Sequence, residues 1–255
     1  MKHRIWETSS SLLIAYEVLA LGYKKALSIR TPFNFDSITE LERVEPPKHD
    51  YANYNQSLAL ITLNASILEG TLRSMISEKL ATDINMSIEE ANKAGRAGPT
   101  KPEQLLFKFR DEVELQGGWE NLKNQYLFYF DLSIEKATDE STREGVNALF
   151  VLRNVIAHGT AIIQPSEKME EEAKDVYPYT WQRKMQRAHV YLKTAFGHDG
   201  FFENLAEHAV PEHFMTVTKK FLQDVHAQVN PAPGRAQKTI EMINNYSFGY
   251  INYSR

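Results

Sequence analysis

The sequence predicts an all-α protein, because apolar residues recur with a period close to 3.6 through most of its 255 positions. Stretches in which apolar and polar residues strictly alternate, as they do in a half-buried strand, are scarce. Clusters of proline and glycine divide the periodic stretches from one another. Together, these three observations indicate a chain of helices joined by loops.

The first predicted helix covers 5–28. Its start, MKHRIW followed by SLLIAYEVLALGY, has the basic front and apolar stretch of a secretion signal, but Glu7 and Glu17 interrupt it. Apolar residues instead follow helical spacing, at Leu12, Leu13, Tyr16, Leu19 and Tyr23. We therefore expect an amphipathic helix that stays in the mature protein. Because no apolar run approaches the roughly 20 residues that span a bilayer, we expect a cytoplasmic protein with no membrane partner.

Seven further helices are predicted. They cover 52–81, 101–116, 119–136, 141–158, 179–196, 211–229 and 235–246. The helix over 52–81 is apolar on more than one face, which is typical of a helix at the centre of a bundle or in an oligomer interface. The acidic segment 165–178 is predicted to be a solvated surface excursion, and the aromatic tail 246–255 could pack on this chain or on a second subunit.

Composition narrows the functions open to this chain. Its length suits one domain covering 1–255. A formal net charge of −4 gives no overall attraction to nucleic acid, so any polyanion must be held by local charge. The absence of cysteine excludes disulfides, thiolate metal ligands and thiol nucleophiles. The sequence lacks a phosphate-binding loop and a dinucleotide glycine motif, and His208 and His213 lack the one-turn spacing of a helical zinc pair, so neither cofactor nor metal is indicated.

The helix over 141–158 carries polar residues where an apolar core helix would not need them. Its start has the form of a capping box, Ser141 to Glu144, and Gly159 is suited to end it. Its core-facing arc comprises Leu149, Leu152, Val155 and Ile156. With Arg153 as the origin and about 100° per residue, Asn154, Asn147 and His158 fall near 100°, 120° and 140°. These three residues form one polar strip, and Arg153 lies at its flank.

Arg153 and His158 are spaced to act on a common group. Five residues separate them by roughly 7.5 Å along the helix axis, and both side chains are long enough to converge on a phosphate. A guanidinium fork matches phosphate oxygens, and an imidazole can transfer protons near neutral pH. The alternative is that each side chain pairs with a neighbouring carboxylate or caps helix carbonyls.

The stretch LFVLRNVIAHGTAI resembles the signature of the HEPN superfamily (higher eukaryotes and prokaryotes nucleotide-binding domains). In that signature four to six residues separate an arginine, commonly followed directly by a polar residue, from a histidine. Here the matching residues are Arg153, Asn154 and His158. Stretches similar to NASILEGTLR and GWENLKNQYLFYF precede the motif helix in many members. The resemblance covers roughly 52–164, so the first helix and the extension over about 165–255 are additions to it.

The resemblance implies an up-and-down helical bundle, usually a homodimer, and in many members a metal-independent ribonuclease of toxin, antiphage or RNA-processing systems. Carried over, His158 is the acid/base group, Arg153 stabilises the phosphate and transition state, and Asn154 positions them. One toxin branch has a tyrosine two residues after the histidine, which an antitoxin modifies. Thr160 stands there in this sequence, which puts that form of control in doubt.

These expectations define a reaction. Cleavage of RNA by its own 2′-OH requires a base, an acid and positive charge at the phosphorus, and a dimer would supply the second imidazole. We expect an endoribonuclease that acts as a toxin or antiphage effector and is held in check by an antitoxin or inhibitor protein. The alternatives are a non-catalytic HEPN module that binds a nucleotide or a protein, and a helical scaffold that binds a protein partner through its aromatic tail.

Further residues are candidates for supporting roles. Asn147 lies in the polar strip. Glu69 is either a solvent-facing acid paired with Arg73 or part of the active site. Arg183, Lys184 and Arg187 form a candidate RNA-binding face, with Trp181 and Tyr191 as stacking rings; the alternative is an ordinary solvated face with the rings turned inward.

Overall fold

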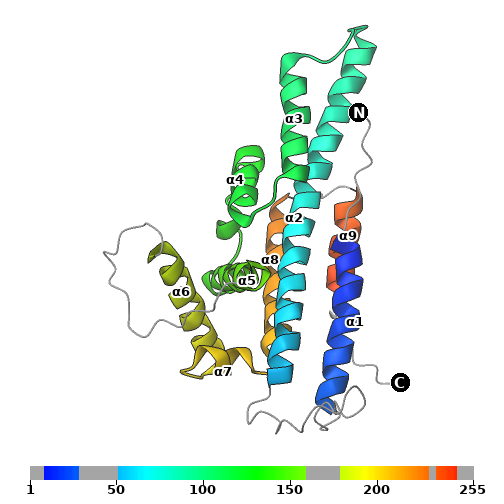
Figure 1. Ribbon diagram of the computed structural model, residues 1–255. Helices are drawn as coiled ribbons and strands as arrows, with labels where there is room; N and C mark the ends of the chain where they lie inside the picture. Colours follow the sequence, from blue (N-terminus) through cyan, green and yellow to red (C-terminus); the bar gives the residue numbers. More distant parts are fainter. Residues whose placement is uncertain (1–8, 29–50, 159–178, 230–233, 246–255) are drawn as a thin grey trace. The chain divides into compact units, whose positions relative to one another are not determined.

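The computed structural model describes residues 9–28, 51–158, 179–229 and 234–245, and the regular structure within these ranges is entirely helical (Figure 1). The all-α prediction is confirmed. The helices are α1 (Ser9–Ser28), α2 (Tyr51–Lys93), α3 (Lys101–Leu115), α4 (Trp119–Phe130), the short 3-10 helix η2 (Ile134–Lys136), α5 (Glu140–His158), α6 (Tyr179–Phe196), α7 (Phe201–Leu205), α8 (Val210–Val229) and α9 (Gly234–Asn245). None of these described helices combines the length and apolar content needed to cross a bilayer.

The chain divides into two compact units. The first takes its described residues from Met1–Leu13, Ala65–Val146 and Val217–Tyr246, and the second from Ile14–Asn64, Asn147–Thr216 and Ser247–Arg255. Consequently α1, α2, α5 and α8 each contribute residues to both units. The single domain over 1–255 stays a prediction.

In the first unit, α2 continues twelve residues beyond the predicted end at 81. Apolar periodicity fades there, but polar side chains take over the contacts between helices. Asp83 accepts a hydrogen bond from the Tyr129 hydroxyl of α4, and Ser87 donates one to Glu103 of α3. Gly95 and Gly98, both with positive φ, then turn the chain from α2 into α3.

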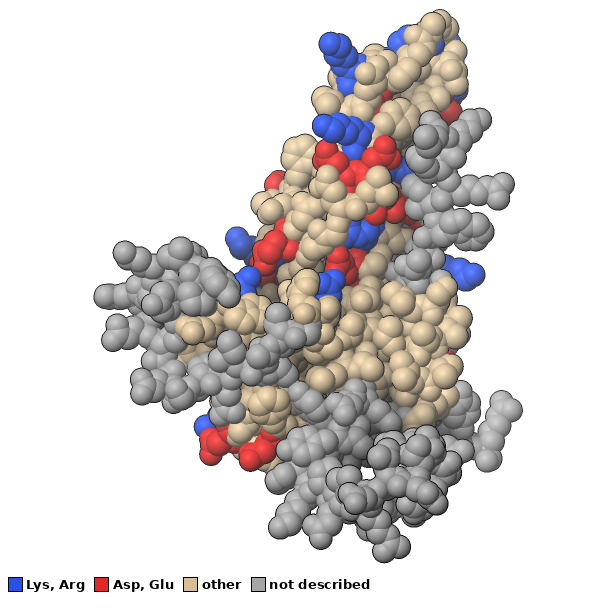
Figure 2. Space-filling model, in the orientation of Figure 1, with Lys and Arg blue, Asp and Glu red and all other residues tan. Residues whose placement is uncertain are grey.

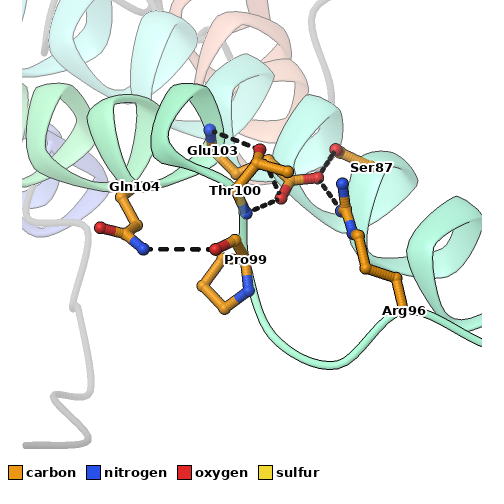
Figure 3. A network of polar contacts seen from close by, with 6 residues as sticks. All are labelled: Ser87, Arg96, Pro99, Thr100, Glu103 and Gln104. Atoms are coloured by element: carbon orange, nitrogen blue, oxygen red, sulfur yellow. Dashed lines mark hydrogen bonds and ion pairs between the residues drawn. The ribbon is translucent and has the colours of Figure 1, made fainter.

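A capping box begins α3 (Figure 3). The Thr100 hydroxyl accepts the backbone N–H of Glu103, and the Glu103 carboxylate accepts the backbone N–H of Thr100 at 2.5 Å. The same carboxylate also accepts hydrogen bonds from Ser87 and Arg96, so it ties α3 to the end of α2. These donors, led by Ser87, lower the pKa of Glu103 from 4.5 to about 2.

The predicted capping box of the motif helix is wrong. The Asp139 carboxylate, not the Ser141 hydroxyl, accepts the backbone N–H of the third residue on, Thr142, at 2.9 Å. Asp139 therefore occupies the N-cap position, one residue before α5 begins at Glu140. Lys220 of α8 forms an ion pair with Asp139 at 3.1 Å, which joins α8 to the start of α5 within the first unit.

In the second unit, buried side chains pack α6, α7 and the first turns of α8. They are Met185, Ala188, Leu192, Phe201, Leu205, Val210 and Phe214. The fully buried Tyr16 of α1 donates its hydroxyl to the Pro211 carbonyl of α8. The sequence analysis did not predict α7, because five residues are too few to show a helical period. The buried Asn204 side chain holds α7 by bonding the backbone of His198 and Gly200.

Candidate functional site

The motif helix has the two-sided character that its sequence predicts. Leu149, Leu152 and Val155 are buried, whereas Asn147 and His158 are exposed. Arg153 and Asn154 are half-buried. All four polar residues belong to the part of α5 that lies in the second unit. The solvent can therefore reach the whole polar strip.

Asn154 and Phe150 both contact the side chain of Arg153. Its Nη1 donates to the Oδ1 of Asn154 at 2.9 Å. Its Cζ lies 5.9 Å from the centre of the Phe150 ring, which is within the range of a cation–π contact. The Phe150 ring is itself only 3% exposed, so the packing around it holds it in place. The guanidinium thus has an amide on one side and an aromatic face on another.

His158 is the last residue of α5. Its exposed imidazole stands roughly 7.5 Å along the axis from Arg153. This placement lets the ring meet a ligand from solution. Gly159, Thr160 and the acidic segment 165–178 lie outside the described residues.

Sequence analysis missed Phe150. An apolar ring on a helix with a buried face is normally a core residue, and Phe150 is buried as such. The signal that could have found it is its spacing, because residues at i and i+3 lie on neighbouring positions of a helix surface. Phe150 precedes Arg153 by three residues.

Glu69 belongs to the first unit, whereas the motif residues belong to the second. Its predicted pair with Arg73 is confirmed at 2.8 Å, but the acid does not face the solvent, since the residue is only 7% exposed. The carboxylate also accepts the backbone N–H of Gly118, and Arg73 donates to the carbonyls of Val113 and Gln116. Glu69 and Arg73 thereby hold the turn between α3 and α4.

The candidate RNA-binding face on α6 is only partly available. Lys184 and Arg187 are exposed and Arg183 is half-buried. The Tyr191 hydroxyl lies 2.6 Å from Nε2 of His213, and its ring packs against the rings of His213 and Phe214. Tyr191 is therefore turned inward, as the alternative interpretation of α6 predicted. Burial lowers the pKa of His213, which favours the neutral imidazole in this contact.

Charged side chains of both signs are interspersed on the face of the described surface shown in Figure 2. Several basic residues of the first unit are neutralised by acids one helical turn away, as in the pairs of Lys79 with Asp83 and Lys108 with Glu112. In these pairs the positive charge is balanced locally.

No family model matches the sequence, and neither a curated protein nor a solved structure gives a match. Among the described residues, no three histidine or acidic side chains come together in a way that could hold a metal ion. The resemblance to the HEPN superfamily therefore rests on the motif residues and their placement at the end of α5.

Proposed function

We propose that the protein is a metal-independent endoribonuclease of the HEPN type. The observation that carries this proposal is the exposed His158 at the end of α5, one and a half turns beyond an Arg153 whose guanidinium is held by Asn154 and Phe150. An accessible proton-transfer group and an oriented cation are two of the components that RNA cleavage without a metal requires.

The reaction is an internal transfer. One imidazole removes the proton of the ribose 2′-OH as its oxygen attacks the adjacent phosphorus. The bond from phosphorus to the 5′ oxygen breaks, and a second imidazole in its protonated form gives that oxygen a proton. Arg153 stabilises the negative charge that builds up on the non-bridging oxygens. The products are a 2′,3′-cyclic phosphate and a 5′-hydroxyl, and DNA is not cut because it has no 2′-OH.

The motif supplies one imidazole per chain, so the proposed reaction needs a second copy. In a two-fold homodimer, the same surface of each chain meets its equivalent, which can bring two copies of Arg153, Asn154 and His158 to one phosphodiester. Asn147 extends the polar strip about two turns from Asn154 toward the start of α5 and would contact the RNA backbone there.

The biological role is proposed by analogy with the superfamily. A ribonuclease that needs no cofactor would be active as soon as its dimer forms, and an inhibitor would protect the RNA of the cell that makes it. We therefore propose a toxin or antiphage effector kept inactive by an antitoxin or inhibitor protein. Growth arrest on expression, relieved by His158→Ala, would support this role.

RNA cleavage in excess chelator tests the proposed activity. We expect wild-type protein to cut RNA, and His158→Ala and Arg153→Ala to lower the rate by at least about 100-fold, since positioned acid–base groups contribute factors of that order. The matched control is His208→Ala, which removes an exposed histidine from the same unit. Its rate should stay within about twofold of the wild type, because His208 lies off α5.

Circular dichroism and sedimentation establish that each variant is folded and associates as the wild type does. If wild-type protein leaves RNA intact, or if His158→Ala cuts as fast as His208→Ala, the ribonuclease proposal is wrong. Binding of a nucleotide without cleavage would favour a non-catalytic HEPN module.

A further inference from the structure

The contact between Arg153 and Phe150 lies on a defined side of α5. With Arg153 as the origin and 100° per residue, Phe150 lies near 60°, Asn154 near 100° and His158 near 140°. Asn154 and Phe150, which both contact the guanidinium, thus lie on the side of α5 that carries His158. These two contacts favour the side of α5 that carries the polar strip.

The two contacts restrain different motions. Asn154 fixes one nitrogen of the guanidinium through a hydrogen bond in the plane of the group. The Phe150 ring attracts the cation electrostatically and limits where its centre can move. Because the ring is buried, it does not move with the arginine and acts as a fixed support. An arginine side chain otherwise samples many rotamers, and losing that freedom on binding weakens the interaction.

We propose that Phe150 is a positioning residue that, with Asn154, orients Arg153 toward the scissile phosphate. This inference rests on the proposed ribonuclease activity. It assigns to Phe150 an effect on the transition state, since Arg153 acts on charge that develops only there. Phe150 itself touches neither the RNA nor the reacting atoms.

Substitutions that remove the ring but keep an apolar side chain test this role. Phe150→Leu and Phe150→Met should each lower kcat about three- to tenfold and leave KM within about twofold, as expected for a contact of this kind. Phe150→Tyr, which keeps an aromatic face, should restore most of kcat. The matched control is Phe214→Leu, which removes a buried ring of α8 in the same unit and should leave kcat within about twofold.

A spectrum of the arginine side chains, recorded on protein labelled with ¹⁵N arginine, measures the contact without reference to activity. A nearby ring shifts the Nε–H resonance of Arg153. We expect Phe150→Leu to move this resonance and Phe214→Leu to leave it in place.

The outcomes separate the two proposals. Active wild-type protein whose kcat is unchanged in Phe150→Leu would overturn the role of Phe150 and leave the ribonuclease intact. An equal loss of kcat in Phe214→Leu would also overturn it, because general destabilisation would then be the cause. Inactive wild-type protein would overturn both proposals, and the resonance of Arg153 would then report only whether the ring contact exists.

Discussion

Single side chains do much to connect the helices of the first unit. Glu69 and Arg73, one turn apart on α2, bond to three backbone groups of the segment that joins α3 and α4. Both side chains are largely removed from solvent, with 10% and 14% of their surface exposed. Each charge therefore depends on the other for the interactions that water no longer provides.

Glu69→Ala should lower the free energy of unfolding by about 2–4 kcal/mol, because it leaves the Arg73 guanidinium buried without its counter-charge. Urea unfolding measures this loss. The matched control is Lys79→Ala, which breaks a more exposed pair on the same helix and should cost less than about 1 kcal/mol. Equal losses of unfolding free energy in the two variants would show that the buried pair stabilises the protein no more than the exposed pair does.

Two carboxylates should make the protein sensitive to acid. Hydrogen bonds, led by that from Ser87, lower the pKa of Glu103 from 4.5 to about 2. The Thr142 N–H, and then Lys220, lower the pKa of Asp139 from 3.8 to about 2. A depressed pKa in the folded state stabilises the protein above the unfolded pKa, and this contribution is lost as the pH falls through the folded value.

We therefore expect the urea midpoint of unfolding to fall as the pH is lowered from about 4.5 to about 2. Glu103→Gln and Asp139→Asn should each lower the midpoint at neutral pH and flatten its dependence on pH in this window. If the urea midpoint of either variant depends on pH down to pH 2 in the same way as that of the wild type, the assigned contacts are wrong.

At the scale of elements, the turns are defined by backbone conformation. Gly118 lies directly before α4 and has φ of 109° and ψ of 133°, a conformation that residues with a Cβ rarely adopt. Apart from its two chain neighbours, no residue in the described part of the chain lies within 4 Å of the position where a Cβ would be, so a substitution there acts through the backbone. The adjacent Gly117 has equally open space and no positive φ.

Gly118→Ala should destabilise the protein by about 1–3 kcal/mol, while Gly117→Ala should change its stability by less than about 1 kcal/mol. Thermal and urea unfolding measure both. Because the two positions are neighbours, their sequence context is matched, although Gly117 is exposed and Gly118 is half-buried. Similar losses in both variants would show that the strained conformation is not what constrains this turn.

The elements that could be predicted from the sequence are those with a strong apolar period. The motif helix begins within one residue of its predicted start and ends at His158 as predicted. Helix α2 extends further than predicted because its last turns are held by polar contacts with α3 and α4, which periodicity does not register. The sequence does not distinguish Asp139 from Ser141 as the N-cap of α5, because both are good capping residues and the ion pair of Asp139 with Lys220 is a tertiary contact.

The candidate site shows the same limit. The angular arrangement of Asn147, Arg153, Asn154 and His158 follows from the period of one helix, so the sequence alone predicts it. The exposure of His158 and the burial of the Phe150 ring that contacts Arg153 depend on which side chains pack around α5. This packing involves residues far apart in the sequence, and the period of one helix does not predict it.

At the scale of the whole molecule, the proposed reaction requires two chains to associate. If two chains form one active site, dilution should lower the rate per chain in step with the loss of dimer. Sedimentation and initial rates, measured over the same range of protein concentration, test this. A rate per chain that stays constant where sedimentation shows single chains would contradict a shared site.

The most direct test of the central claim is the mass spectrum of the fragments that wild-type protein leaves from a defined RNA in excess chelator. Internal transfer catalysed by His158 and Arg153 predicts fragments with 2′,3′-cyclic phosphate and 5′-hydroxyl ends. Intact RNA, or fragments with 3′-hydroxyl and 5′-phosphate ends, would contradict it.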